Sequence, residues 1–155
     1  MRLPPPLWAL TAVLVQRVLT PGAPPPTPTR TAAAGVGSLA SLTLAGMAWG
    51  QFFRTGTTVE PFRPQEASVL VTTGANALTR NPMYVGMAGL LVANAIRRGS
   101  FVALAPVAGF VVVIDRFQIP AEEVALRKNF GSEYIAYCAA APRWLGRPQA
   151  ARSLR

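Results

Sequence analysis

The apolar residues of this chain are concentrated in four blocks, and most of its charged residues lie between or beyond them. The blocks run over 7–19, 31–53, 83–96 and 101–119. Hydrophobic residues make up 51% of the chain and charged residues 14%, whereas about a quarter of an average soluble domain is charged. This segregation is typical of a polytopic membrane protein. We therefore predict an all-α membrane helical bundle with about four transmembrane helices and a C-terminal amphipathic cytosolic segment.

The second block is the clearest candidate for a membrane span. As a helix, residues 31–53 would measure about 34 Å, which exceeds a hydrocarbon core of about 30 Å. Its glycine, alanine and serine residues would let neighbouring helices approach closely in lipid, so we expect it to be packed inside the bundle. The third block is short for a span, so it either begins before Met83 or lies where the bilayer thins. The short linker 97–100 predicts an antiparallel hairpin of the third and fourth helices.

The first block allows two interpretations. Residues 7–19 have the length of the apolar region of a signal peptide, and Arg2 supplies a basic start. However, the small residues that follow, Gly22 and Ala23, run directly into prolines rather than into a clean cleavage pattern. We therefore favour a retained helix that is short or tilted.

The distribution of basic residues predicts the orientation in the membrane. Four spans would place both termini and the loop 54–82 on one face, with eleven arginine and lysine residues against four on the other. Cytosolic segments carry such an excess, so we predict a multi-pass inner-membrane protein whose active site faces the cytosol. The net charge of +9 is also a feature of nucleic-acid-binding proteins. We predict no nucleic-acid partner, because the basic residues are mostly single arginines that flank apolar blocks.

The length of the chain suits one domain, 1–155. Within it we expect a first helical hairpin over 1–53, a motif-bearing core over 54–145 and a basic tail over 146–155. The sequence contains no histidine and one cysteine, Cys138. A disulfide within the chain, a thiolate metal cluster and imidazole-based catalysis are therefore excluded, and we predict no metal site.

The first of two polar segments that could carry chemistry spans 70–86. Gly74 is typical of a turn that frees backbone amides, and Pro82 suits the first turn of a helix because it lacks an N–H. A helix N-terminus beside Arg80 is a natural place for a carboxylate or another anion. The alternative is an ordinary helix start with an arginine that reaches toward the membrane surface.

The second polar segment begins at Pro120, which can open a helix. Glu122 and Glu123 complement the positive end of the helix dipole. Adjacent helical residues point about 100° apart, so only one of the two glutamates can face the bundle. We expect Glu123 to lie on a solvated face as an ion-pair partner of Arg127. Glu122 shares its stripe with apolar residues and is expected to face inward.

Further along, Gly131 is expected to break this helix, with Tyr134 and Tyr137 on one side of a short final helix. The alternative is an amphipathic helix on the membrane surface, with the tyrosines at headgroup level. Asp115 and Arg116 lie where the fourth block leaves the bilayer. Charges at that depth are functional candidates, or else an interfacial pair that marks the end of the span.

Together, these segments resemble the isoprenylcysteine carboxyl methyltransferase family of membrane enzymes and the related phospholipid N-methyltransferases. The resemblance covers about residues 54–145 and consists of five motifs in order at matching separations. The motifs are Leu70-Val71-Thr72-Thr73-Gly74, Arg80-Asn81-Pro82-Met83-Tyr84-Val85-Gly86, Glu122-Glu123-Val124-Ala125-Leu126, Phe130-Gly131-Ser132-Glu133-Tyr134-Ile135-Ala136-Tyr137 and Pro142-Arg143-Trp144. The resemblance implies methyl transfer from S-adenosyl-L-methionine, bound at the cytosolic end of the bundle.

The resemblance also implies which residues form the site. The implied cofactor-binding residues are Ser68, Val69, Leu70, Val71, Asn76, Asn81, Pro82, Met83, Tyr84 and Glu122. The predicted catalytic residues are Arg80, Glu122 and Arg116. Glu122 would bind the amino group or hydroxyls of the cofactor, and either arginine could hold an anionic substrate.

Two positions depart from the family pattern. Asn81 stands where a histidine is frequent; it keeps a hydrogen-bonding group but cannot titrate. Gln118 stands where enzymes that act on prenylated proteins have an arginine, which weighs against a prenylcysteine acceptor. Phospholipid amines, thiols and other lipophilic acceptors stay open. The alternative function is a non-catalytic four-helix membrane protein, such as a small transporter or an assembly subunit, which would not explain why polar residues gather in two cytosolic segments.

Overall fold

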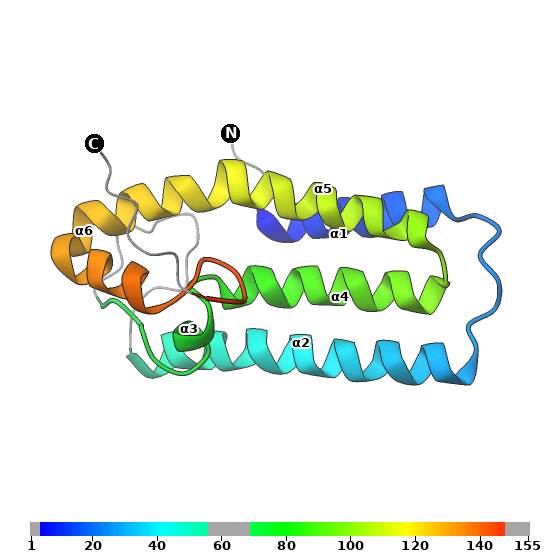
Figure 1. Cartoon of the computed structure of the whole chain (residues 1–155), viewed down its shortest axis with the longest axis horizontal. Helices are drawn as coiled ribbons and strands as arrows, with labels where there is room; N and C mark the ends of the chain where they lie inside the picture. The colour runs from blue at the N-terminus through cyan, green and yellow to red at the C-terminus, as the bar shows by residue number, and fades with distance from the viewer. Residues whose placement is uncertain (1–3, 56–68, 148–155) are drawn as a thin grey trace. The chain divides into compact units, whose positions relative to one another are not determined.

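The computed structural model describes residues 4–55 and 69–147. All regular elements in these two ranges are helical (Figure 1), which confirms the all-α class for them. Of these elements, η2 is a 3₁₀ helix and η3 is a π-helix. The elements are α1 (Pro5–Leu19), α2 (Pro28–Thr55), α3 (Ala75–Leu78), α4 (Pro82–Arg98), η2 (Phe101–Leu104), α5 (Ala105–Val113), η3 (Ile114–Gln118) and α6 (Ile119–Ala140).

Prolines and glycines set element boundaries where the sequence predicts them. Pro82 is the first residue of α4. Gly131 interrupts α6 with a φ of 51° and a ψ of −120°, which confirms the predicted break. Gly99, with a φ of 62°, forms the turn between α4 and η2. Both glycines adopt backbone angles that residues with a Cβ atom rarely adopt.

Two helical runs among the described residues are long and apolar enough to cross a membrane, Pro28–Gln51 and Phe101–Ala140. The other two predicted spans are shorter. With 15 residues, α1 is about 22 Å long, and α4, with 17 residues, is about 26 Å long. Both fall short of a hydrocarbon core of about 30 Å. A membrane helical bundle is therefore supported, whereas four spans are not confirmed.

The chain divides into two compact units. Unit 1 comprises residues up to 43 together with 86–118, and unit 2 comprises 44–85 together with the residues from 119 onward. Each unit thus combines segments that are far apart in the sequence. The predicted cofactor-binding residues that the structure describes all belong to unit 2.

In unit 1, α1 packs against α5 and η2. A polar side chain, Gln16, is completely buried in this packing. Its amide nitrogen donates to the backbone carbonyls of Leu91, at 2.9 Å, and Ala103, at 2.8 Å. Its amide oxygen accepts from the side chain of Asn94 at 2.7 Å. Because every polar atom of this buried amide has a partner, α1 is an integral part of the unit.

The prediction that the second block is packed inside the bundle is wrong for most of its length. Only 11% of the most apolar window in α2 is buried. Close approach is confined to one line, where Gly37 and Ser41 of α2 face Ala93 and Gly89 of α4. A Cβ atom on Gly89 would collide with the Ser41 side chain. Small residues elsewhere on α2, such as Gly35, face open space, so they do not mark further helix contacts.

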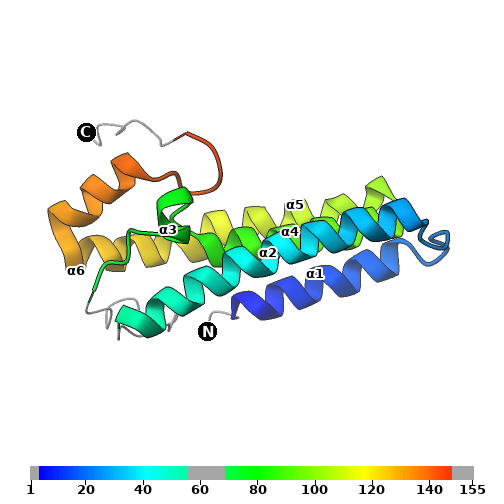
Figure 2. The same cartoon turned by 90° about the horizontal axis from the view of Figure 1, so that it is seen from below.

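Unit 2 contains the end of α2, the segment 69–81 with α3, the start of α4, and α6 with the residues after it. After Gly131 the chain of α6 turns back (Figure 2), so that its last part lies beside α3. Tyr134 and Tyr137 are buried there and meet edge to face, with ring centroids 6.2 Å apart. Apolar side chains from both parts of α6 pack on this pair, including Leu126 and Phe130. The kink thus builds a small core beneath the polar cluster described next.

Candidate functional site

Two predicted site residues meet directly in unit 2. Tyr84 lies in the first turn of α4 and Glu122 near the start of α6. The phenol of Tyr84 donates a hydrogen bond of 2.6 Å to Oε1 of Glu122. Tyr84 is buried and Glu122 is half-buried. So short a bond to a carboxylate is typical of a charge-assisted hydrogen bond, which fixes the orientation of the carboxylate.

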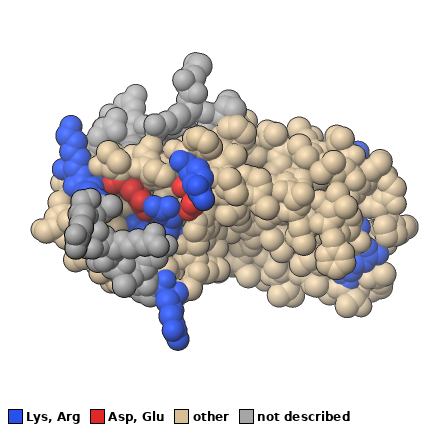
Figure 3. All heavy atoms as spheres, turned by 45° about the horizontal axis from the view of Figure 1, so that its top comes forward, with Lys and Arg blue, Asp and Glu red and all other residues tan. Residues whose placement is uncertain are grey.

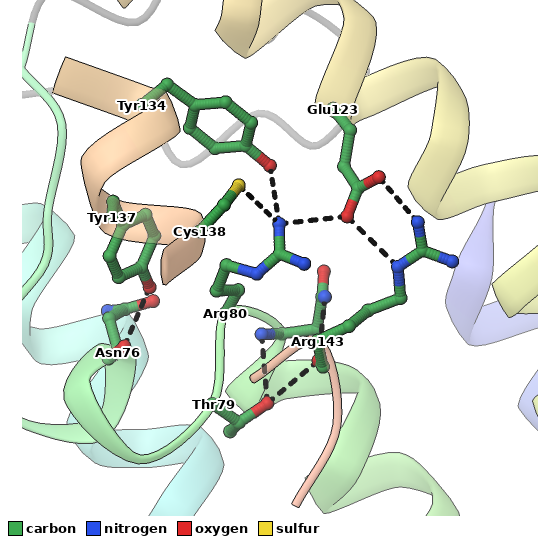
Figure 4. A network of polar contacts seen from close by, with 9 residues as sticks. Asn76, Thr79, Arg80, Glu123, Tyr134, Tyr137, Cys138 and Arg143 are labelled. Carbon is green, nitrogen blue, oxygen red and sulfur yellow. Dashed lines mark hydrogen bonds and ion pairs between the residues drawn. The ribbon is translucent and has the colours of Figure 1, made fainter. Parts of the chain in front are cut away.

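The neighbouring Glu123 binds two arginines from other segments (Figure 4). Its Oε1 lies 3.0 Å from Nη1 of Arg80, and its two oxygens accept from Nε and Nη2 of Arg143 at 3.0 and 2.6 Å. The side chain of Glu123 is 17% exposed. The expectation of a solvated face was therefore wrong. An exposed ion pair four residues apart on a helix, such as the predicted Glu123–Arg127 pair, contributes only about 0.2–0.5 kcal/mol. The fold instead brings the guanidiniums of Arg80 and Arg143 to this carboxylate.

Arg80 is engaged by the protein itself. Its side chain is 8% exposed, and besides Glu123 its Nη1 donates to the phenol of Tyr134 at 3.1 Å and to Sγ of Cys138 at 2.8 Å. Its Nε is buried and has no hydrogen-bond partner among the described residues. Arg80 was predicted to hold an anionic substrate. In the structure its charge faces the carboxylate of Glu123.

The residues after α6 dock onto the turn that enters α4. The N–H of Arg80 donates to the carbonyl of Pro142 at 2.8 Å. The hydroxyl of Thr79 and the side-chain amide of Asn81 both donate to the carbonyl of Arg143, at 3.0 and 2.9 Å. Asn81 in turn accepts the backbone N–H of Tyr84 on its own carbonyl at 3.0 Å. One hydrogen-bonded chain therefore runs from the C-terminal residues to the first turn of α4.

A second set of contacts fixes α3. The phenol of Tyr137 donates to the carbonyl of Asn76 at 2.7 Å, and the side-chain amide of Asn76 donates to Oε1 of Gln51 at 3.3 Å. Gln51 also donates to the hydroxyl of Thr73 at 3.2 Å. Gly74, with a φ of 59°, lies against the Gln51 amide so closely that a Cβ atom would collide with it. This confirms the predicted turn at Gly74.

Tyr134 and Tyr137 follow the kink, and five charged residues separate them from the apolar stretch that ends at Ile119. Burial raises the pKa of the Tyr134 phenol, and the negative charge of Glu123 raises it further. Burial likewise raises the pKa of the Tyr137 phenol. Both phenols therefore stay protonated at neutral pH and can act as hydrogen-bond donors.

The remaining predicted residues are placed as follows. Val69 is exposed, whereas Leu70, Val71 and Met83 are half-buried and Pro82 is buried. Ser68 lies outside the described residues. Arg116 lies in η3 of unit 1, with its side chain 75% exposed and its Nε 3.6 Å from Asp115. Its catalytic role stays a prediction.

Sequence reasoning missed several residues of this cluster as site candidates, above all Gln51 and Arg143. Gln51 is a polar residue near the end of an otherwise apolar block, which was the available signal. Arg143 lies in the last of the five motifs, but its partner is 20 residues away, so no local spacing rule indicates the pair.

Charged residues are unevenly distributed over the surface. On the face drawn in Figure 3, acidic and basic side chains occur close together, while a broad area shows neither.

A cavity of about 480 Å³ opens on α6. It is lined by Pro120, Glu123, Val124, Arg127 and Lys128. Glu123 therefore borders both this cavity and the arginine cluster.

Membrane-length helices and a compact cluster of motif residues define a membrane-associated protein with a built polar site. A family model described as phospholipid methyltransferase matches residues 32–133, which is 102 of the 155 residues. The chain belongs to this family, and the membership implies methyltransferase activity and association with lipid. Membership in this family does not favour the alternative function of a small transporter or an assembly subunit.

An uncharacterised protein of Haemophilus influenzae is 38% identical over 63 residues, which cover 41% of this chain and 100% of that protein. No solved structure matches the chain.

Proposed function

We propose that the protein transfers a methyl group from S-adenosylmethionine to a lipophilic or membrane-associated acceptor at the cytosolic face of the membrane. The observation that carries the proposal is the hydrogen bond of 2.6 Å between Tyr84 and Glu122, which are 38 residues apart. It joins the first turn of α4 to the start of α6, two segments within the region that the family model matches. Each polar segment alone has too few polar groups to bind a nucleoside, and this hydrogen bond brings the two segments together to form a composite cofactor site.

The side chains of unit 2 fit the chemistry of S-adenosylmethionine, which bears a sulfonium, an amino group, ribose hydroxyls and a carboxylate. Glu122 supplies a negative charge for the cationic or hydroxyl groups. The cluster around Glu123 contains two guanidiniums for one carboxylate, so its net positive charge attracts the cofactor carboxylate at long range without a direct contact. We assign cofactor binding to Ser68, Val69, Leu70, Val71, Asn76, Asn81, Pro82, Met83, Tyr84 and Glu122.

When bound, S-adenosylmethionine supplies an already activated methyl group. The residues of the chain then have to bind and orient the reactants, and such positioning alone accounts for much of the rate of many enzymes. Glu122 performs the binding step, and Tyr84 fixes the direction of its carboxylate. We assign Arg80 to holding Glu123 rather than to contacting the substrate, because its Nη1 already contacts Glu123, Tyr134 and Cys138.

The acceptor belongs to a lipophilic class, since the family acts on lipid and two helical runs have membrane length. Prenylcysteine-like carboxylates, phospholipid amines and small thiols are the candidates. Gln118, which is buried, stands where the prenylcysteine enzymes that the chain resembles have an arginine. We therefore place the phospholipid amine and the thiol before the carboxylate.

Calorimetry with S-adenosylhomocysteine and the full chain in detergent tests the cofactor assignment. Glu122→Gln should weaken binding by about tenfold to a hundredfold, because a charged hydrogen bond contributes roughly 1.5–3 kcal/mol. Glu133→Gln is the matched control, since Glu133 is exposed on the same helix after the kink. Label from radioactive S-adenosylmethionine should then enter one of three acceptors, namely a lipid extract, a prenylcysteine analogue or a thiol. A wild-type protein that does not bind S-adenosylhomocysteine would refute the proposal.

A further inference from the structure

The residues after α6 form a strap over the turn that enters α4. We use this name for residues 141–147, which include the buried Ala141 and Pro142. Three hydrogen bonds hold the strap on residues 79–81, with donor–acceptor distances of 2.8, 2.9 and 3.0 Å. Two of them end on the carbonyl of Arg143, the residue whose side chain also reaches Glu123.

Glu123 ties the strap to α6 through a two-point contact. Arg143 approaches the carboxylate with Nε and Nη2 at 3.0 and 2.6 Å, so the pair is bidentate. The same carboxylate holds Arg80, which belongs to the turn beneath the strap (Figure 4). One glutamate therefore connects three segments, and bidentate pairs of this kind restrict direction as well as distance.

The turn under the strap leads directly to the residues assigned to the cofactor. The side chain of Asn81 donates to the strap, and its carbonyl accepts the N–H of Tyr84 and of Val85 in the first turn of α4. Tyr84 then donates to Glu122, which precedes Glu123 in the chain. The two adjacent glutamates thus face different partners: Glu122 faces Tyr84, and Glu123 faces the strap and the turn.

We propose that Glu123 and Arg143 are positioning residues, which hold the strap on the turn 79–81 and thereby fix Asn81 and Tyr84 for the methyl donor. This inference rests on the proposed function, because it assigns a purpose to the placement of the donor site. Neither residue has to touch the donor. Their effect passes through the hydrogen bonds of Thr79, Arg80 and Asn81.

Arg143→Met is the sharpest test. It keeps the ion pair between Arg80 and Glu123 and removes the guanidinium that binds the strap to α6. Arg147→Met is the matched control, because Arg147 is an exposed arginine of the same strap. Arg143→Lys keeps the positive charge without the bidentate geometry, so it should restore part of the effect.

Hydrogen–deuterium exchange and calorimetry with S-adenosylhomocysteine are measured on each full-length variant in detergent. Arg143→Met should speed exchange at 79–84 and at 141–147. It should also weaken binding about tenfold, a size found for residues that act on a site without touching its ligand. Arg147→Met should match the wild type in both measurements, and Arg143→Lys should lie between. Glu123→Gln should show the same two changes, and if it fails to fold, Arg143→Met decides the question.

Three results separate the possible failures. Unchanged exchange at 79–84 in Arg143→Met would overturn the strap. Faster exchange with unchanged affinity of the folded protein would show a purely structural strap and overturn the positioning role. If wild-type protein does not bind S-adenosylhomocysteine at all, the proposed function fails and the positioning role fails with it, while the exchange data still decide whether the strap holds the turn.

Discussion

Replacing Glu123 by glutamine should destabilise the protein more than replacing the strap arginine with which it pairs. Glu123 lies between Arg80, at 3.0 Å, and Arg143, at 2.6 Å, and its side chain is 17% exposed. The substitution removes the negative charge that Arg80 and Arg143 share in this contact. Losing one partner of a buried pair costs about 3–5 kcal/mol. Because Glu123 keeps some contact with water, we expect a cost of about 3 kcal/mol, at the lower end of that range.

Arg143→Met should lower the free energy of unfolding by a smaller amount, because the ion pair between Arg80 and Glu123 remains. The loss is that of charged hydrogen bonds, about 1.5 kcal/mol. Glu133→Gln, at an exposed position, should stay within about 0.5 kcal/mol of wild type. Unfolding by dodecyl sulfate in mixed micelles, followed by helical circular dichroism, would give the three free energies. If Arg143→Met is as costly as Glu123→Gln, or if Glu123→Gln is silent, the charge balance described here is wrong.

Three further outcomes are expected. Gly74→Ala should lower the free energy of unfolding by about 1–3 kcal/mol, because the position has a positive φ and the added Cβ atom would collide with Gln51. The control Gly109→Ala lies in a helix with open space around it and should not lower the free energy of unfolding. Gln16→Leu should cost about 1–3 kcal/mol in the same unfolding assay, since it leaves Asn94 without its acceptor in unit 1; a neutral result would contradict the buried amide contacts. Reporter fusions after Arg155 and after Arg98 should give cytosolic and external signals respectively, and equal signals would remove the predicted topology.

Local rules predicted the helix boundaries well, because backbone chemistry is local. Pro82 begins α4, Gly74 turns with a positive φ and Gly131 breaks α6, each for a reason that is visible in a few residues. The family resemblance implied that Tyr84 and Glu122 belong to one cofactor site, and in the structure the Tyr84 hydroxyl lies 2.6 Å from Oε1 of Glu122. Only the resemblance grouped these two residues, since no periodicity in the sequence relates positions at that separation.

The same local rules failed where long-range partners compete. The spacing of Glu123 and Arg127 satisfies the rule for a helical ion pair, yet Glu123 binds Arg80 and Arg143. The small residues of the second block predicted a helix packed inside the bundle, yet the close approach of α2 to α4 follows one line, through Gly37 and Ser41. Both failures have one cause. A local sequence pattern shows which contacts a residue can make, but it does not show which distant segment the fold places next to that residue.

The strap also explains how the site can do without the histidine that is frequent at position 81 in the family that the sequence resembles. In this chain the side chain at that position donates to the carbonyl of Arg143 at 2.9 Å. An amide performs this task as well as an imidazole N–H, and unlike histidine it does not change its charge near neutral pH. The contact between turn and strap should therefore stay intact through the pH range in which a histidine would titrate. Asn81→His should make exchange at 79–84 depend on pH around 6.5, the ordinary pKa of histidine, where the wild type shows only the intrinsic pH dependence of amide exchange. A variant without this added dependence would mean that the charge of the side chain at position 81 does not affect the contact with the strap.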